Sequence, residues 1–298
     1  MRVQAFVTGL AEVYASLQPP SFSPTFLSDL ADVRGSLPES RSKDFDFLSE
    51  QFNRWHLWAQ QRMALHLKSL PLDDPLLCPI SLFRTMDYGR LETAHTRTLA
   101  WLLDPTKEHG FGPALLAALL RWLTRRDQFD SLSTEHVASE YHISGAEENG
   151  RLDVVAEGTW REDGKQVRWI LVIEAKVYAW EGDSQLAKYD EWLNLECKGY
   201  RVLRVFLTPD GRAATGGDDE WEALSYLNLV RTFRPTYTAL RGAPGFHFLQ
   251  LYLAGVLQDI CGWPSKVTAD TRDPYSVLDY LRKDPSTHSE EISHELSR

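Results

Sequence analysis

The chain has 298 residues, of which 43% are hydrophobic and 25% are charged. These proportions are typical of a folded globular protein with one large domain or two smaller ones, and they exclude a largely disordered chain. The net charge of −10 supplies no overall positive field, so any contact with nucleic acid requires a local basic patch or bound cations.

Three cysteines, Cys78, Cys197 and Cys261, lie far apart in the sequence and lack the paired spacing of a zinc site or a disulfide framework. The N-terminal stretch is a poor signal peptide, because its apolar segment is short and is interrupted by Glu12. No apolar run approaches the length of about 18 residues that marks a membrane span. We therefore expect a cytoplasmic protein without membrane contact.

The N-terminal part of the chain shows helical periodicity with Pro-rich interruptions, and its longest helix is predicted over 45–70. A second helix is predicted near 89–103. It ends before Pro105, because a proline disfavours helical geometry in the residue that precedes it. After the loop TKEHGFG, a third helix is predicted over 113–126, with Pro113 in its first turn.

From residue 137 the pattern changes to that of a sheet. Stretches rich in β-branched, aromatic and aliphatic residues predict four strands, with the sequences VASEYHIS, RLDVVAEGTW, QVRWILVIEAK and YRVLRVFLTP. Between the last two, GDSQLAKYDEWLNLECKG predicts a helix capped by Asp183 or Ser184. WEALSYLNLVRTF, at 221–233, and FHFLQLYLAGVLQDI predict two further helices.

These elements predict an α/β (α+β) fold, in which a mixed sheet has helices before, within and after it. We divide the chain into a helical N-terminal region at 1–80, a core with flanking helices at 81–265, and a polar C-terminal tail at 266–298. The tail is expected to form a marginal helix or to fray.

The third predicted strand ends in two charged residues, Glu174 and Lys176. Residues two apart in a strand project from the same face, so these side chains form either a site or a salt bridge. A Glu-x-Lys triplet also occurs by chance, and the chain contains a second one, Glu196-Cys197-Lys198, at the end of a predicted helix. The triplet alone therefore does not decide between the two alternatives.

The preceding strand makes a site more plausible. Asp163-Gly164 predicts a two-residue type I′ turn between the second and third strands. Continued from this turn, the strand register places Asp153 directly opposite Glu174, with Cβ atoms about 4.5 to 5.5 Å apart. A bulge or a longer turn would shift this register by one residue.

Two carboxylates at this separation repel each other unless a cation lies between them. An ammonium partly serves, and a divalent metal serves better; oxygen ligands favour Mg²⁺ or Mn²⁺ over zinc. Such a metal polarises a phosphoryl oxygen and lowers the pKa of a bound water, while Lys176 stabilises the developing negative charge. The three residues predict a phosphodiester hydrolase, and a structural salt bridge is the alternative.

Asp153, the triplet Glu174-Ala175-Lys176 after an apolar strand, and Gln185-Leu-Ala-Lys-Tyr189 on the next helix resemble the PD-(D/E)XK nuclease superfamily. The last of these is similar to the Gln-x-x-x-Tyr motif of its helicase-nuclease and CRISPR-associated branch. Arg151-Leu152 stands where the name of the superfamily puts a proline before the aspartate.

Flanking motifs resemble a bacterial branch of the same superfamily. Upstream these are Glu92-Thr-Ala-His95-Thr96, LAWLLDP and His109-Gly110; downstream, FLTPDG is followed by Trp221-x-x-Leu-Ser-Tyr226. Together the motifs extend over about residues 83 to 233. The resemblance implies a restriction-endonuclease-like αβββαβ core and cleavage of DNA, with RNA as the rarer substrate. A role in bacterial defence or repair follows from the same analogy.

The resemblance also implies a metal site for Mg²⁺ or Mn²⁺. Its ligands would be Asp153, Glu174, the backbone carbonyl of Ala175 and, from the first core helix, Glu92. Of the other residues, Lys176 would be the catalytic lysine.

On the helix after the third strand, Gln185 would orient the site as part of the catalytic set. Tyr189, one turn later on the same helical face, would orient the site or contact the substrate. For both residues a structural role is the alternative: Gln185 could help to cap its own helix, and Tyr189 could pack in the core with its hydroxyl satisfied.

Lesser candidates are two histidines, His95 and His109, and an acid, Glu140, on the strand before the hairpin. A lone histidine more often makes a buried hydrogen bond than it performs chemistry. The arginines at 121, 125 and 126 suit phosphate, but a helix C-terminus attracts arginines in any case.

Two other functions stay open. A catalytically silent module that binds nucleic acid or a protein partner is favoured by the net charge, whereas the intact set of two acids and a lysine argues against it. A general acid and base acting on a sugar is disfavoured by the lysine beside the carboxylates, and it would not depend on a metal. A homodimer agrees with the resemblance, because double-strand cutters of the superfamily often dimerise. An accessory protein partner is a further expectation, because an acidic nuclease has little charge attraction for DNA.

Overall fold

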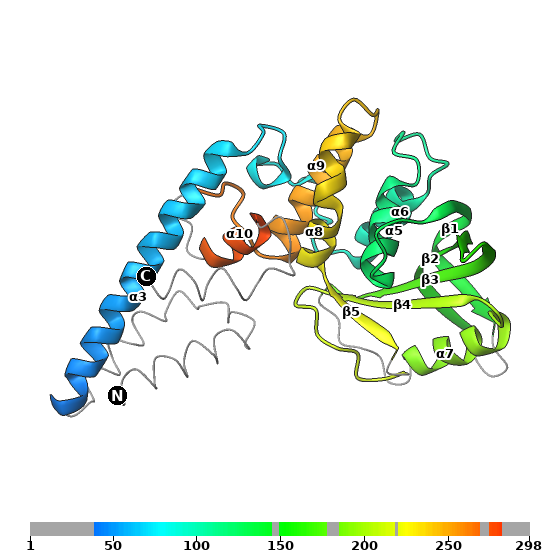
Figure 1. Ribbon diagram of the computed structural model, residues 1–298, viewed down its shortest axis with the longest axis horizontal. Helices are drawn as coiled ribbons and strands as arrows, with labels where there is room; N and C mark the ends of the chain where they lie inside the picture. The colour runs from blue at the N-terminus through cyan, green and yellow to red at the C-terminus, as the bar shows by residue number, and fades with distance from the viewer. Residues whose placement is uncertain (1–38, 145–148, 178–184, 218–219, 269–273, 282–298) are drawn as a thin grey trace. The chain divides into compact units, whose positions relative to one another are not determined.

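The computed structural model (Figure 1) describes the chain over 39–144, 149–177, 185–217, 220–268 and 274–281. It contains two compact units, one formed by Met1–Pro71 with Val267–Arg298 and the other by Leu72–Lys266, and each is described by itself. The helix cap predicted at Asp183 or Ser184 lies outside the described residues, as do the start of the N-terminal region and the end of the C-terminal tail. The predicted domain boundaries stay a prediction.

In the first unit, α3 (Glu39–Ser69) and α10 (Pro274–Leu281) contact each other. α3 contains most of the helix predicted over 45–70 and begins before it. Met63 of α3 and Val277 of α10 are both buried. Part of the predicted C-terminal tail is therefore a packed helix.

Five strands of the second unit form one mixed sheet in the order β1-β2-β3-β4-β5. Neighbours among β1, β2 and β3 are antiparallel, whereas β3, β4 and β5 run parallel. The strands are Asp130–Ser144, Asn149–Glu162, Lys165–Ala175, Arg201–Thr208 and Trp221–Ser225.

The central strand β3 is buried without interruption from Trp169 to Ala175. Its sequence is nearly continuous in apolar residues, as expected for a strand covered on both faces. Helix α7 (Gln185–Glu196) connects β3 to the parallel strand β4, and its Leu186 and Leu193 join a hydrophobic cluster with Val172. Because alternate residues of a strand share a face, Glu174 projects to the same side as Val172.

Helices α5 (Glu92–Leu103) and α6 (Ala114–Thr124) precede the sheet. α5 packs against β1 and β2, and Figure 1 shows α5 and α6 on one side of the sheet with α7 on the other. With α6 inserted between α5 and β1, the order α5, β1, β2, β3, α7, β4 reproduces the expected αβββαβ core. The fold is therefore α/β and restriction-endonuclease-like.

Short and C-terminal helical segments complete the second unit. They are η1 (Pro75–Leu77), α4 (Leu82–Thr85), α8 (Tyr226–Tyr237), η2 (Thr238–Leu240), α9 (Phe246–Gly255) and η3 (Val256–Ile260). α8 packs against α6, so the C-terminal helices lie beside the start of the core. Among the described residues, no helix is long and apolar enough to cross a membrane.

The single helix predicted over 221–233 is wrong at its start. Trp221–Ser225 forms β5, which pairs in parallel with β4. Ser225 then caps α8, because its Oγ accepts a hydrogen bond from the backbone N of Asn228 at 3.0 Å. The apolar spacing suits a short strand as well as a helix, and the pairing partner lies in another part of the sequence.

Candidate functional site

The turn between β2 and β3 sets the register of the two strands that carry the predicted acids. Asp163 and Gly164 have φ values of 51° and 75°, as a type I′ turn requires. Strand pairing runs without a shift from Glu162↔Lys165 to Val154↔Ile173. The predicted register is thus confirmed, and its next step places Asp153 opposite Glu174.

Asp153 is 8% exposed at the end of this ladder. Its Oδ2 accepts a hydrogen bond of 2.9 Å from the backbone N of Ala175. Burial raises the pKa of the Asp153 carboxyl, although this hydrogen bond and the charge of Lys176 oppose the shift. The contact fixes the side chain of Asp153 against the end of β3.

Glu174 is 1% exposed, and its two carboxylate oxygens have different surroundings. Oε1 accepts hydrogen bonds from Nζ of Lys176 and, at 2.8 Å, from Nε2 of Gln185. Oε2 is buried without a hydrogen-bond partner among the described residues. Burial, and then the charge of Asp153, raise the pKa of Glu174 to about 8.

Lys176 is 7% exposed, and its backbone N donates to the carbonyl of Leu207 on β4 at 2.8 Å. Its Nζ contacts Glu174 and lies 4.0 Å from Oε1 of Glu92. Burial lowers the pKa of Lys176, but the carboxylates of Glu174, Glu92 and Asp153 outweigh it and raise the pKa overall. The buried ammonium therefore stays charged.

Glu92 is the first residue of α5, where an acid is also favoured by the helix dipole. Its Oε2 accepts a hydrogen bond of 3.1 Å from the backbone N of Val177, directly after Lys176. The start of α5 is thereby tied to the end of β3. Glu92 therefore lies at the site, as the sequence predicted. Its role as a metal ligand stays a prediction.

Gln185 and Tyr189 lie one turn apart on α7 and meet through their side chains. Nε2 of Gln185 donates to Tyr189 Oη at 2.8 Å as well as to Glu174. The Tyr189 hydroxyl in turn donates to the carbonyl of Arg151 on β2 at 2.6 Å, and burial raises its pKa. A continuous chain of hydrogen bonds therefore links β2, α7 and the carboxylate of Glu174.

The two histidines singled out in the sequence lie in the protein interior. Nε2 of His95 is 3.1 Å from the carbonyl of Gly89, and Nε2 of His109 is 2.9 Å from the carbonyl of Asp104. Nδ1 of His109 accepts from the backbone N of Phe111 at 2.9 Å. Burial lowers the pKa of both histidines, and both fill structural positions.

The structure adds a pair of arginines that the sequence did not single out for a role. Arg97 of α5 and Arg151 of β2 both contact the carboxylate of Glu140 on β1. Arg151 precedes Asp153 by two residues on the same strand, and this spacing could have indicated from the sequence that Arg151 lies near the site. Arg97 has no such signal, because its contact with Glu140 depends on how α5 packs on the sheet. In contrast, Arg125 pairs with Glu222 of β5.

Glu92, Asp153, Glu174 and Lys176 together form a cluster that we call the acidic centre, and it fits a hard divalent cation. Its donors are carboxylate oxygens of Asp153 and Glu174, and one of them is buried and unpaired among the described residues. Burial and the neighbouring charge of Asp153 raise the pKa of Glu174, and a bound cation would oppose this rise. In the described part of the chain, no three acidic, histidine or cysteine side chains form a complete metal cage. The carbonyl of Ala175 and the Glu92 carboxylate are further oxygen donors beside the two acids.

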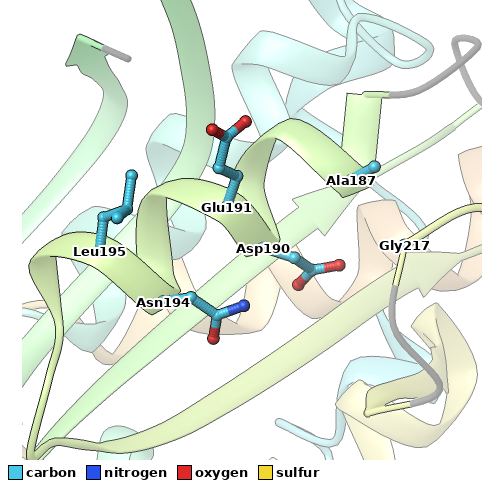
Figure 2. Close-up of a pocket in the computed structure, with 6 residues that line it drawn as sticks. All are labelled: Ala187, Asp190, Glu191, Asn194, Leu195 and Gly217. Atoms are coloured by element: carbon cyan, nitrogen blue, oxygen red, sulfur yellow. The ribbon is translucent and has the colours of Figure 1, made fainter. Parts of the chain in front are cut away.

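A hollow of about 470 Å³ lies elsewhere, along α7. Figure 2 shows Asp190 and Asn194 pointing toward the segment at Gly217, while Glu191 and Leu195 point away from it. Asp190 is engaged structurally, because it accepts hydrogen bonds from Nε of Arg204 at 2.9 Å and from the indole of Trp221. None of the four charged residues of the acidic centre lines this hollow.

A match to a family model agrees with this geometry. No curated protein and no solved structure matches the chain. A family model described as the PD-(D/E)XK nuclease superfamily matches residues 81–250, more than half of the chain. That match contains α5, all five strands and α7, and so every residue of the acidic centre. The chain belongs to the PD-(D/E)XK nuclease superfamily.

Proposed function

We propose that this protein is a metal-dependent nuclease that hydrolyses phosphodiester bonds, with DNA as the expected substrate and RNA as the alternative. One observation carries the proposal. Asp153 and Glu174 are buried on neighbouring strands, and Oε2 of Glu174 has no partner among the described residues. A buried carboxylate is costly unless a cation or hydrogen bonds compensate it. A divalent metal provides that compensation.

Asp153 and Glu174 would hold Mg²⁺ or Mn²⁺, with the Ala175 carbonyl and Glu92 as further ligands. When bound, the metal polarises a phosphoryl oxygen and lowers the pKa of a coordinated water. The hydrogen bond from the Ala175 backbone N keeps Asp153 in place for this task. Gln185 holds Oε1 of Glu174, which leaves Oε2 for the metal.

Lys176 stabilises the negative charge that develops when water attacks the phosphorus atom. Its ammonium is held in place by Glu174 and remains charged because three carboxylates surround it. A preorganised cation in a water-poor site stabilises such charge more strongly than one in bulk solvent. Tyr189 positions Gln185 through the hydroxyl-to-amide contact, and direct contact of Tyr189 with the substrate stays a prediction.

The activity test is cleavage of supercoiled plasmid, linear duplex, single-stranded DNA and RNA in Mg²⁺, Mn²⁺ or EDTA. We expect wild type to cut in metal but not in EDTA, and we expect Asp153→Ala and Lys176→Ala to cut nothing. The matched control is Lys198→Ala, which alters the second Glu-x-Lys triplet at an exposed position and should leave cleavage unchanged. Equal loss in all three variants, or cleavage in EDTA, contradicts the proposal.

A binding module without catalysis is the second candidate. It is supported by the net charge of −10, which supplies no overall positive field for a polyanionic substrate. If folded wild type binds nucleic acid or a protein but cuts none of the four substrates in either metal, this candidate replaces the first.

The proposal extends to the cellular setting of the protein. We place the protein in the cytoplasm, because its three cysteines are free. The superfamily supports a role in defence against foreign DNA or in repair. Since the chain is acidic overall, a homodimer or an accessory protein would add to its affinity for DNA.

A further inference from the structure

Glu140 of β1 joins two arginines from different elements. Its Oε2 accepts a hydrogen bond of 2.6 Å from Nε of Arg97 and a second from Nη2 of the same residue. Its Oε1 lies 2.9 Å from Nη1 of Arg151. Each carboxylate oxygen thus serves one guanidinium, and Glu140 holds the two positive charges side by side.

This group lies next to the acidic centre. Strand pairs Ser139↔Val154 and Tyr141↔Leu152 enclose Glu140 and Asp153, so these two acids stand level on neighbouring strands. Burial raises the pKa of Asp153 overall, and the charge of Arg151 is one of the influences that oppose this rise. Arg97 belongs to α5, whose first residue, Glu92, reaches the end of β3.

The backbone of Glu140 has a φ of 51°, in the left-handed region that is unfavourable for glutamate. Residues persist in this conformation where surrounding contacts enforce it, and such residues gather at functional sites. Strand β1 therefore has an unfavourable backbone conformation at Glu140, level with Asp153. In this conformation the carboxylate of Glu140 contacts the guanidinium groups of the two arginines.

The arginines remain accessible. Their side chains are 64% and 51% exposed, whereas that of Glu140 is 17% exposed. A guanidinium has five N–H donors on three nitrogens, so a second acceptor can bind while Glu140 keeps its contacts. Two arginines and one glutamate sum to a net charge of +1 beside the site of an otherwise acidic protein.

We propose that Arg97 and Arg151 form a phosphate-binding clamp for the nucleic-acid backbone, held in shape by Glu140. The clamp rests on the proposed nuclease function and binds a phosphate adjacent to the one that is cleaved. Paired guanidinium groups match the oxygens of a phosphodiester well. The clamp also supplies the local positive patch that an acidic nuclease requires to bind a polyanion.

The test measures binding of fluorescein-labelled duplex DNA, single-stranded DNA and RNA by anisotropy at several salt concentrations. The parent is full-length Lys176→Ala in Mg²⁺, and wild type in EDTA is a second parent that keeps the result independent of that substitution. Arg97→Gln and Arg151→Gln should each weaken binding about tenfold and reduce the slope of log K against log salt by about 1. Arg125→Gln is the matched control, because its side chain is also 64% exposed and also pairs with a glutamate.

Glu140→Gln separates the clamp from a purely structural network. It removes a negative charge and keeps both arginines, and its single amide oxygen can still accept from one of them, so we expect binding a few-fold tighter than in the parent. Weaker binding in Glu140→Gln and both arginine variants, together with a lower melting temperature in all three, would show a structural network instead. Arginine variants that bind like Arg125→Gln overturn the clamp and leave the nuclease intact. A parent that binds none of the three nucleic acids overturns both.

Discussion

Nζ of Lys176 contacts Oε1 of Glu174, whereas Oε2 of the same carboxylate has no partner among the described residues. The ion pair therefore neutralises only part of the negative charge of Glu174. Asp153 adds a second negative charge on the neighbouring strand. Breaking a buried ion pair is strongly destabilising, although the pair itself adds little stability. The grouping of Lys176, Glu174 and Asp153 therefore favours a preorganised functional site over a stabilising salt bridge.

Divalent metal should stabilise the protein, and more so at alkaline pH. The pKa of Glu174 rises from 4.5 to about 8 on folding, so the metal-free folded state keeps a proton that the unfolded chain has lost. The contribution of Glu174 to stability therefore falls as the pH rises through this window, by about 1.4 kcal/mol per unit of pKa difference. A metal replaces that proton, so binding competes with protonation below about pH 8.

Thermal unfolding with Mg²⁺ or EDTA checks this prediction. The gain in melting temperature should be larger at about pH 8.5 than at about pH 6.5, because less Glu174 is protonated there. Glu174→Gln should lose the gain at both values. The same gain at both pH values, or a gain that survives in Glu174→Gln, would contradict the prediction.

Two substitutions of Glu92 should separate its structural contact from its charge. Glu92→Gln keeps an oxygen that accepts from the backbone N of Val177, so its melting temperature should stay close to that of wild type. Loss of the negative charge should still reduce cleavage by about tenfold to a hundredfold and raise the metal concentration for half-maximal rate. Glu92→Ala should lose both activity and stability. Wild-type metal dependence in Glu92→Gln would exclude a role for Glu92 at the metal.

Removal of the Tyr189 hydroxyl should affect stability and cleavage together. Tyr189→Phe leaves the carbonyl of Arg151 without this donor, which should lower the free energy of unfolding by about 1 kcal/mol. Gln185 also loses its hydroxyl partner, so cleavage should slow. Tyr237→Phe is the control, because its hydroxyl donates to the carbonyl of Asp73, outside the acidic centre.

Urea unfolding and initial cleavage rates of the two variants decide the matter. A similar loss of stability in both, with slower cleavage in Tyr189→Phe alone, is the expected result. If cleavage falls equally in both variants, stability explains the loss and Tyr189 has no positioning role.

The sequence predicted the part of the site that depends on local rules. The turn residues Asp163 and Gly164 fix the β2–β3 register, and that register places Asp153 opposite Glu174. The one-turn spacing of Gln185 and Tyr189 likewise predicts that both face the site, and their hydrogen bond agrees with this. These inferences succeeded because each one involves neighbouring residues or a two-residue turn.

Contacts between distant elements could not be predicted in the same way. The bond from the Val177 backbone N to Glu92 and the pairing of Arg97 with Glu140 depend on the packing of α5 against the sheet. Strand β5 was missed because its apolar residues also suit a helix, and its partner strand is set by tertiary structure. The cap at Ser225 is the local signal that could have located the start of α8.

The buried histidine of α5 should make the protein less stable in acid. His95 is 1% exposed, and burial lowers its pKa from 6.5, against the opposing influence of the Gly89 carbonyl and Asp259. The rings of Phe83, Tyr226 and Tyr252 surround the imidazole. Because the folded-state pKa is the lower one, the unfolded chain binds the proton first, and the stability from neutral His95 is lost as the pH falls below 6.5.

His95→Gln removes this titration and keeps a side-chain donor for the Gly89 carbonyl. At about pH 8 wild type should be the more stable protein, because glutamine packs less well among the three rings. The difference in unfolding free energy should narrow as the pH falls through 6.5. The substitution leaves His109 unchanged, so the contribution of His109 should cancel in this difference. Urea unfolding at several pH values measures the difference in unfolding free energy between the two proteins. A difference that stays constant with pH would mean that His95 has the same pKa in the folded and unfolded states.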